Sequence, residues 1–288
     1  MLLSEAFELY RRDYIVFKNQ SKKTEESHLL AARSLLSFLG DMPIENLEFQ
    51  HIRDWKENIE LKVTSNTSRL YVIKLRNVLK FMRLRGFTCI AEEAVAVPKR
   101  NAAVIDFLTP EEVEQMILAI EIGRYAYTKK GWLRNVAVIS LLYASGIRVS
   151  ELCRLNKSDL RIPGSFTVIG KGNKPRLCFY DDRAREAIEA YLESRSDKNQ
   201  ALFICEQNGK RLTPGMVQMV FRTVSKRVGR DINPHMMRHS FATNLLRNNT
   251  NLYYVSKFLG HASTQTTEMY LHFVNEDLRD IYSEKHTC

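Results

Sequence analysis

The chain has 288 residues, enough for two domains that each bury a core. With 44% apolar residues, 26% charged residues and few Gly and Pro, its composition is that of an ordinary soluble globular protein rich in helix. Lys and Arg outnumber Asp and Glu by 43 to 33, and both halves of the chain share this excess. Nucleic acid, before a membrane, is therefore the expected partner.

Cysteine usage and the N-terminus indicate the compartment. Five Cys, an odd number without short paired spacing, argue against a disulfide framework and a cysteine zinc site. Residues 1–8 lack the basic region of a signal peptide, and no apolar run approaches the roughly 20 residues that span a bilayer. We expect a cytoplasmic protein, associated with the nucleoid if the host is prokaryotic, without membrane contact.

The first 95 residues predict a small all-helical domain. Hydrophobic spacing predicts amphipathic helices over residues 2–18, 24–39, 46–60 and 65–85. Thr24 is the expected N-cap of the second helix, and Gly40 is expected to end it.

The fourth helix carries a single sign of charge. No Asp or Glu occurs from Leu61 to Ala91, whereas seven basic residues do. The apolar stripe consists of Leu75, Val78, Leu79 and Met82, and the basic face consists of Arg69, Arg76, Lys80 and Arg83. A solvated helix face usually mixes signs, so we predict that this face binds a DNA phosphate backbone. A plain solvated surface is the alternative.

Residues 96–107 lack a clear hydrophobic periodicity and are the predicted linker, so the second domain is expected to cover residues 108–288. Thr109, Pro110 and Glu112 are typical of a helix start with a capping box. Residues 131–145 predict a core helix that Gly146 ends, and a further helix begins near Arg148.

A β-hairpin follows. Residues 166–170 and 176–180 are β-prone, and Lys171 lies in the turn between them. Further helices are expected from Asp181 to about residue 194, from Pro214 to about residue 228, and over residues 275–285. The last is charged and amphipathic, and suits packing on its own domain or on a neighbouring molecule.

Residues 234–270 place chemically useful side chains on consecutive short helices. His235 and Arg238 stand three apart and share one helix face. Gly260 and His261 mark a helix end, and the Ser/Thr-rich residues 263–267 can cap a short helix that carries Tyr270. An arginine fork, imidazoles near neutral pKa and a phenol suit chemistry on a phosphate.

Each of these residues also has a plain structural interpretation. Most tyrosines are packing residues, Lys171 is ordinary turn chemistry, and Arg148 is an acceptable helix-surface arginine. His235 and His239 stand four apart like zinc ligands, but a zinc-protease helix needs Glu where Met236 stands. We therefore predict no metal site, and we interpret His239 as a packing or supporting residue.

Five motifs in sequence order resemble those of the tyrosine recombinase (phage-integrase-like) family, and within it the short Xer-type recombinases. The motifs are SGIRVSEL at 145–152, GKGNK at 170–174, HMMRHSFAT at 235–243, LGH at 259–261 and TTEMY at 266–270. The resemblance implies a mainly α fold with a small β-hairpin. It also implies an N-terminal helical (SAM-like) core DNA-binding domain, and a C-terminal catalytic domain that ends in an exchange helix.

The resemblance implies a role for each residue in strand exchange without a cofactor. Tyr270 is the implied nucleophile, which forms a 3′-phosphotyrosyl link and leaves a 5′-hydroxyl. The other implied catalytic residues are Arg148 and Arg238 on the phosphate oxygens, Lys171 as general acid, His235 as proton acceptor and His261 as hydrogen-bond donor. Glu151 is expected to orient the site, with an ordinary ion pair as the alternative.

The implied partner is double-stranded DNA with two recombinase-binding half-sites, bound by a tetramer of this chain or of this chain and a paralogue. An accessory activator is a further implied partner. The expected task is resolution of chromosome or plasmid dimers, and integration or excision of a mobile element is the close alternative. A type IB topoisomerase and a non-catalytic DNA-binding protein are the rival classes.

Overall fold

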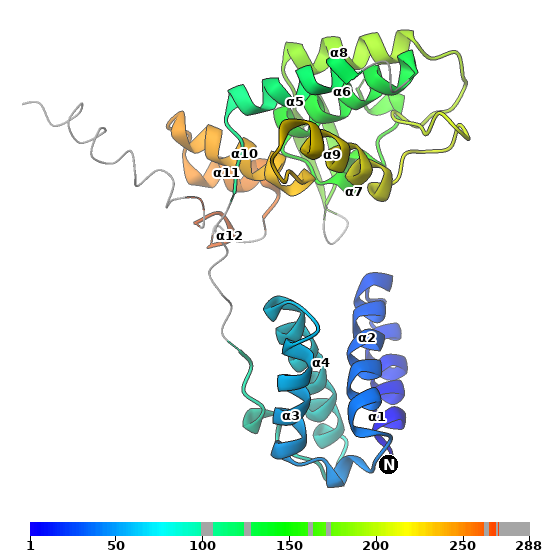
Figure 1. Ribbon diagram of the computed structural model, residues 1–288, viewed down its shortest axis with the longest axis vertical. Helices are drawn as coiled ribbons and strands as arrows, with labels where there is room; N and C mark the ends of the chain where they lie inside the picture. The colour runs from blue at the N-terminus through cyan, green and yellow to red at the C-terminus, as the bar shows by residue number, and fades with distance from the viewer. Residues whose placement is uncertain are drawn as a thin grey trace, which may run out of the picture. The chain divides into compact units, whose positions relative to one another are not determined.

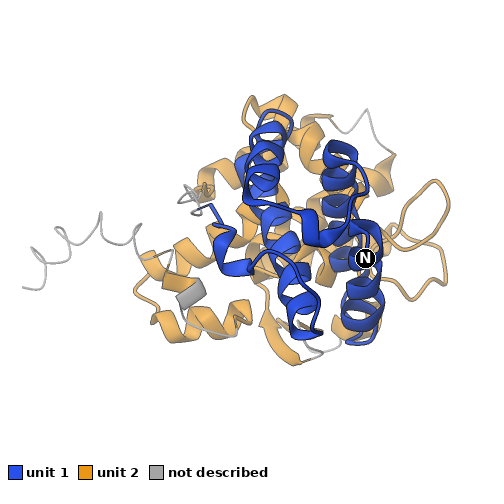
Figure 2. Ribbon diagram, turned by 90° about the horizontal axis from the view of Figure 1, so that it is seen from below, with its two compact units in different colours: residues 1–103 blue, residues 104–288 orange. Residues whose placement is uncertain are grey.

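Helices dominate both parts of the chain, as the hydrophobic spacing predicts (Figure 1). The computed structural model describes residues 1–98, 106–123, 128–160, 164–170, 174–261, 265–268 and 270, without the side chains of 265 and 266. It divides into two compact units, Met1–Ala103 and Val104–Cys288, which are coloured separately in Figure 2. The expected helix over residues 275–285 lies outside the described residues.

The first unit packs four α-helices around one hydrophobic core. Its elements are α1 (Leu3–Tyr10), the π-helical turn η1 (Arg11–Val16), α2 (Lys22–Leu39), η2 (Ile44–Asn46), α3 (Phe49–Glu60), α4 (Ser65–Leu84) and η3 (Glu92–Ala94). Helix α4 packs against the other three helices, and its predicted apolar stripe is fully buried. The stripe buries because residues three and four apart share one helix face.

Two helix predictions in this unit need correction, one of helix type and one of a helix start. The predicted helix over residues 2–18 changes to π-helical geometry at Arg11. The N-cap of α2 is Ser21, whose side chain accepts a hydrogen bond from the Thr24 amide. The predicted end at Gly40 is confirmed, with a φ of +75° that suits glycine.

The second unit is built around α6. Its elements are α5 (Pro110–Ile122), α6 (Lys129–Ser145), α7 (Val149–Leu152), η5 (Lys157–Leu160), β1 (Ser165–Ile169), β2 (Pro175–Phe179), α8 (Asp182–Glu193), α9 (Pro214–Val228), α10 (Pro234–Arg247), α11 (Leu252–Leu259) and α12 (Gln265–Glu268). Helix α6 contacts α5, α8 and α10. Its residues 137–142 are all buried, because this part of the helix is apolar on every side except at Ser140.

Local capping rules fix several ends in this unit. The side chain of Thr109 accepts from the Glu112 amide, and Glu112 accepts from the Thr109 amide, so the predicted capping box of α5 is confirmed. Asp181 caps α8 as predicted. Strands β1 and β2 form an antiparallel hairpin in which Val168 pairs with Arg176.

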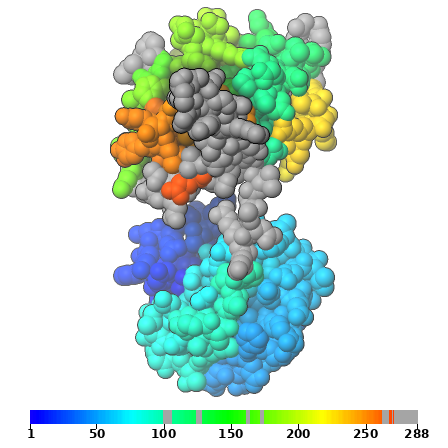
Figure 3. Space-filling view, turned by 90° about the vertical axis from the view of Figure 1, so that its left-hand side faces the viewer, coloured from blue at the N-terminus to red at the C-terminus, as the bar shows by residue number. Residues whose placement is uncertain are grey.

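A smaller apolar cluster lies under α10 and α11. It contains Ala242, Leu246, Val255, Leu259 and Tyr270. Helix α11 also contacts β2, and in Figure 3 the orange surface of the α11 region adjoins the green surface of the hairpin region. The ends of α6, α11 and β2 therefore come close to one another, and the candidate site is built there. None of the described helices is long and apolar enough to cross a membrane.

Candidate active site

Arg148 is positioned by the turn between α6 and α7. Gly146 ends α6 in the left-handed region with φ of +60°, and a Cβ at this position would overlap the ring of Phe241. Arg148 is then the N-cap residue of α7, and its amide donates to Oε2 of Glu151 at 2.8 Å. Its guanidinium donates to Oε1 of Glu151 at 3.0 Å. The side chain of Arg148 is 32% exposed, so part of its fork faces outward.

Glu151 is saturated with hydrogen bonds. Besides the two from Arg148, it accepts from Nη1 of Arg176 at 2.8 Å and from Nη2 at 2.7 Å. The Glu151 side chain is only 4% exposed, and burial by itself raises a carboxyl pKa. The hydrogen bonds and the two positive charges outweigh burial and lower the pKa of Glu151 to about 2. Glu151 is therefore ionised at neutral pH.

Arg238 is buried between two helix ends. Its Nη1 donates to the carbonyl of Gly146 at 2.7 Å, and its Nη2 donates to the carbonyl of Leu259 at 2.5 Å. These carbonyls lie at the negative ends of α6 and α11, which favour a cation. Burial, followed by the charges of Arg148 and Arg176, lowers the pKa of Arg238 to about 10. The guanidinium remains charged at neutral pH.

Tyr270 is 1% exposed, and its hydroxyl lies 2.7 Å from Nδ1 of His239. Burial raises the pKa of the phenol, while the charge of Arg238 opposes that change. Burial also lowers the pKa of His239 to about 4, with the neighbouring His235 and Arg238 acting in the same direction. At neutral pH the pair thus consists of a neutral phenol and a neutral imidazole.

The two other histidines of the predicted site, His261 and His235, lie near this pair. The Nδ1 of His261 lies 2.9 Å from the hydroxyl of the buried Thr267, and burial lowers the pKa of His261 to about 4. The charges of Arg238, Arg148 and Arg176 act in the same direction. His235 is exposed at the start of α10, where Asn233 accepts from its backbone amide at 3.0 Å.

The structure therefore gathers the predicted residues Arg148, Glu151, Arg238, His261 and Tyr270. Lys171 lies outside the described residues, so its role stays a prediction. The residues on either side of 171–173 are joined by a 2.9 Å hydrogen bond from the Gly170 amide to the Lys174 carbonyl.

The sequence did not indicate Arg176 as part of the site, and it indicated His239 only as a packing or supporting residue. Arg176 lies on β2 two residues before the buried Cys178, so a basic residue on the inward face of a strand was the available signal. His239 shares a helix face with Ala242 and Leu246, which pack around Tyr270. That spacing can be read from the sequence, but no local sequence pattern predicts that Tyr270 contacts this helix face.

The predicted DNA-binding residues of α4 differ in their surroundings. Nε of Arg69 donates to the Pro98 carbonyl at 3.0 Å. Arg83 pairs with Glu92 at 2.6 Å and with Glu93 at 2.8 Å, so the acidic residues absent from the helix itself are supplied by η3.

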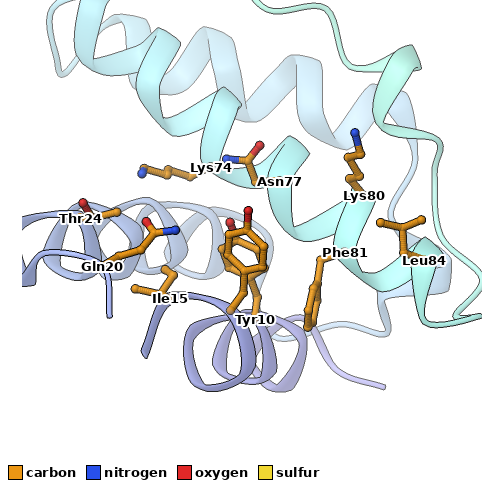
Figure 4. Close-up of a pocket in the computed structure, with 10 residues that line it drawn as sticks. Tyr10, Ile15, Gln20, Thr24, Lys74, Asn77, Lys80, Phe81 and Leu84 are labelled. Carbon is orange, nitrogen blue, oxygen red and sulfur yellow. The ribbon is translucent and has the colours of Figure 1, made fainter. Parts of the chain in front are cut away.

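Arg76 is half-buried and Lys80 is exposed. Lys80 borders a hollow of about 380 Å³ between α4 and the start of α2. In Figure 4, Lys74, Asn77 and Lys80 extend from α4, with Gln20 and Thr24 opposite. Burial lowers the pKa of Lys74 on this wall. Basic and amide groups thus line part of the hollow, and aromatic and apolar side chains of α1, η1 and α4 line the rest.

The charge balance defines what the site in the second unit attracts. Three guanidinium groups accompany one carboxylate, which pairs with two of them, and the half-buried His239 and His261 are neutral at neutral pH. The site therefore attracts an anion, and the geometry of arginine suits phosphate oxygens. Within the described residues, no group of His, Cys, Asp and Glu is arranged to hold a metal ion. The site and the fold are those of a phosphoryl-transfer enzyme with a tyrosine beside an arginine cluster.

Comparison with known proteins identifies the family. Residues 106–276 match the phage integrase family. The chain is 31% identical to the tyrosine recombinase XerC of Bacillus pumilus over 287 residues, covering 93% of this chain and 92% of that protein. It is 37% identical to XerC of Staphylococcus epidermidis over 256 residues, covering 85% and 84%. The chain belongs to the phage integrase family, and within it is an Xer-type tyrosine recombinase, an enzyme that cleaves and religates DNA.

A solved structure supports the fold. The Tn1549 transposon integrase in complex with transposon right end DNA superposes with a TM-score of 0.78, at 19% identity, covering 98% of this chain and 99% of that one. The predicted mainly α fold with a small hairpin is thus confirmed.

Proposed function

We propose that the chain exchanges DNA strands at a specific site, with Tyr270 as the nucleophile and Arg148 and Arg238 as the phosphate-binding residues. One observation carries this assignment. A phenol bonded to a neutral imidazole lies in the same site as two arginines that share one carboxylate and a third, Arg238, that is held by two backbone carbonyls. Such a site attracts a backbone phosphate and offers it a nucleophile.

The reaction is a transesterification. The phenol oxygen of Tyr270 forms a bond to the scissile phosphorus, and the bond from phosphorus to the 5′-oxygen breaks. Arg148 and Arg238 stabilise the charge that collects on the non-bridging oxygens. The 3′-phosphotyrosyl link keeps the energy of the broken bond, so a 5′-hydroxyl of another strand can reverse the step without a nucleotide.

Two protons have to move. The phenol loses one, for which His235 is the acceptor implied by the family, while His239 is the imidazole that contacts the hydroxyl. The leaving 5′-oxygen gains one, for which Lys171 is the proposed acid. His261, held by Thr267, is proposed to donate a hydrogen bond to the phosphate, and Glu151 to orient Arg148.

We further propose that both units grip the duplex. Residues 1–95 would act as a DNA-binding domain through Arg76, Lys80 and the hollow that Lys80 borders, joined by residues 96–107 to a catalytic domain over residues 108–288. The active form would be a tetramer on two DNA sites, of this chain alone or with a paralogue. The C-terminal segment would pass to a neighbouring subunit, and an accessory protein would activate the assembly.

The proposed task is resolution of chromosome or plasmid dimers, in keeping with the relatives named XerC. Integration or excision of a mobile element is the second candidate, which the likeness to a transposon integrase supports at the level of fold.

A trapping assay tests the chemistry and the task together. Nicked duplexes are drawn from a library of the host chromosome and from DNA flanking the gene, and incubated in EDTA with wild type and Tyr270→Phe. We expect a protease-sensitive covalent adduct with wild type and none with Tyr270→Phe. Adduct formation that persists in Tyr270→Phe would overturn the assignment of the nucleophile. The trapped sequence identifies the site, and its position near the replication terminus or at an element end separates the two tasks.

A second assay distinguishes the proposed recombinase from a type IB topoisomerase. Supercoiled plasmid without the trapped sequence is incubated with wild type. A recombinase leaves it supercoiled, whereas a type IB topoisomerase relaxes it as a monomer.

A further inference from the structure

Arg176 occupies an unusual place beside the site. It lies on β2, 25 residues after Glu151 in sequence, and donates to both oxygens of that carboxylate at 2.8 and 2.7 Å. Its Nε donates to the carbonyl of Phe258, near the end of α11, at 3.2 Å. One side chain thus joins the strand that follows the Lys171 loop, the α7 carboxylate and the helix that precedes His261.

Arg176 and Arg148 compete for the same acceptor. Oε1 of Glu151 accepts from Nη1 of both arginines, and Oε2 accepts from Nη2 of Arg176 and from the backbone amide of Arg148. A carboxylate has about four lone-pair positions, so Glu151 is fully used. Arg148 is left with a single side-chain bond to Glu151, at 3.0 Å.

The exposure of the two arginines differs accordingly. The Arg176 side chain is 11% exposed and has all three guanidinium nitrogens bonded, whereas the Arg148 side chain is 32% exposed. Arg148 therefore keeps more unused and more exposed donors for an incoming phosphate than Arg176 does. The close approach of the Arg176 side chain to α11 depends on Gly260, where a Cβ would lie 2.7 Å from Cδ of Arg176.

We propose that Arg176 is a positioning residue that holds both oxygens of Glu151 and so prevents this carboxylate from drawing Arg148 into a two-pronged ion pair. Arg148 is thereby kept free to bind the scissile phosphate. The proposal rests on the proposed function of Arg148, and it concerns a residue outside the implied catalytic set. Removal of Arg176 frees two acceptor positions on a buried carboxylate, and Arg148 is the cation that already contacts it.

A double-mutant cycle tests this competition. The variants are Arg176→Met, Glu151→Gln and the combination of both, and the measured quantity is the initial rate of adduct formation on the trapped duplex. We expect Arg176→Met to slow the reaction by roughly tenfold to a hundredfold, because a misplaced phosphate ligand carries a penalty of that order. In the double variant the neutral amide no longer attracts Arg148, so we expect a rate severalfold above that of Arg176→Met.

The direction of this change is diagnostic. A purely structural Arg176 predicts that a second buried substitution slows the enzyme further. A double variant as slow as Arg176→Met, or slower, overturns the proposal. Arg176→Lys, which keeps the charge but not the two-pronged geometry, is expected to lie between wild type and Arg176→Met.

A second measurement is independent of DNA cleavage. Inorganic phosphate is titrated into wild type and the same variants, and binding is followed by NMR at the guanidinium of Arg148. We expect weaker phosphate binding at Arg148 in Arg176→Met and recovery in the double variant. Equal phosphate binding in wild type and Arg176→Met overturns the proposal even if no duplex is ever trapped. A missing adduct with this phosphate pattern intact counts instead against the proposed recombination chemistry.

Arg195 provides a matched control. Its side chain is 1% exposed, pairs with both oxygens of Asp197 at 2.9 and 2.5 Å, and donates to the carbonyls of Ala201 and Leu202. Arg195→Met removes a paired arginine that is buried even more completely than Arg176 and lies away from the site. We expect it to lower thermal stability without altering the cleavage rate of the folded protein. An equal loss of rate in Arg195→Met assigns the effect of Arg176→Met to general destabilisation and overturns the proposal.

Discussion

The hydroxyl of Tyr270 lies 2.7 Å from Nδ1 of His239, on a histidine that the sequence indicated as a packing residue. Both side chains are largely buried, and the pKa of the imidazole is lowered to about 4 by burial and by the charges of His235 and Arg238. A neutral ring nitrogen is therefore next to the phenol at physiological pH. Because of this contact and the predicted role of His235, both His239 and His235 are candidates for accepting the phenol proton of Tyr270.

The two histidines can be separated by substitution. If His239 accepts the phenol proton, His239→Ala slows adduct formation by about 10²–10⁴-fold, the usual contribution of a positioned base. His235→Ala then has a smaller effect, and the pattern reverses if His235 is the acceptor. The measurement is the single-turnover rate of adduct formation on the trapped duplex. His239→Gln retains a hydrogen-bond acceptor for the phenol and serves as the conservative control.

Stability should fall on mild acidification. The pKa values of His239 and His261 are lowered from 6.5 to about 4 in the folded chain, so between these values the unfolded chain binds more protons. The free energy of unfolding therefore decreases as pH falls through this window. Glu151 contributes only below it, since its pKa changes from 4.5 to about 2.

Chemical denaturation at about pH 7 and about pH 5 measures this effect. His239→Gln should reduce the difference between the two midpoints. An identical pH dependence in wild type and His239→Gln would contradict the lowered pKa of His239.

Gly260 should tolerate alanine less well than Gly229. Both glycines follow helices in the left-handed region, with φ of +62° and +76°. A Cβ on Gly229 has no atom within 4 Å, whereas a Cβ on Gly260 meets the Arg176 side chain. Gly229→Ala should therefore cost about 1–2 kcal/mol, the backbone penalty alone.

Gly260→Ala should cost more than that and should also slow adduct formation, because it displaces Arg176 from the Phe258 carbonyl. Urea denaturation and the trapping assay on both variants give the comparison. Equal destabilisation by the two substitutions would show that a clash with the Arg176 side chain does not add to the loss of stability.

On α4, charge neutralisation should separate three of the predicted DNA-binding residues, Arg76, Lys80 and Arg83. Each of Arg76→Ala and Lys80→Ala should weaken DNA binding and reduce the slope of log affinity against log salt by about 1 if the residue contacts a phosphate. Arg83→Ala should have less effect, because Arg83 already pairs with Glu92 and Glu93. Binding is measured across a salt series in the Tyr270→Phe background.

Removal of an opposing negative charge provides the control. Glu93→Gln releases part of the Arg83 charge and should strengthen non-specific binding slightly. A loss of affinity in Arg83→Ala as large as that in Lys80→Ala would show that DNA displaces the carboxylates.

Local physics determined much of this protein in advance. The capping box at Thr109 and the helix ends at Gly40 and Gly146 depend on a few neighbouring residues, and the structure has them as predicted. The buried stripe of α4 follows from helical spacing alone. The order of arginine, histidine and tyrosine motifs indicated the family, because these side chains are needed whatever holds them.

Tertiary structure decided the partners of those side chains. Arg176 meets Glu151 across 25 residues, and His239 meets Tyr270 across 31. Arg83 acquires acidic neighbours that its own helix lacks. Hydrogen bonds, burial and charge act through space, so pKa values and the sharing of a carboxylate depend on how helix and strand ends converge. The sequence determined which groups are present, and packing determined which of them are neutral, paired or free to bind a phosphate.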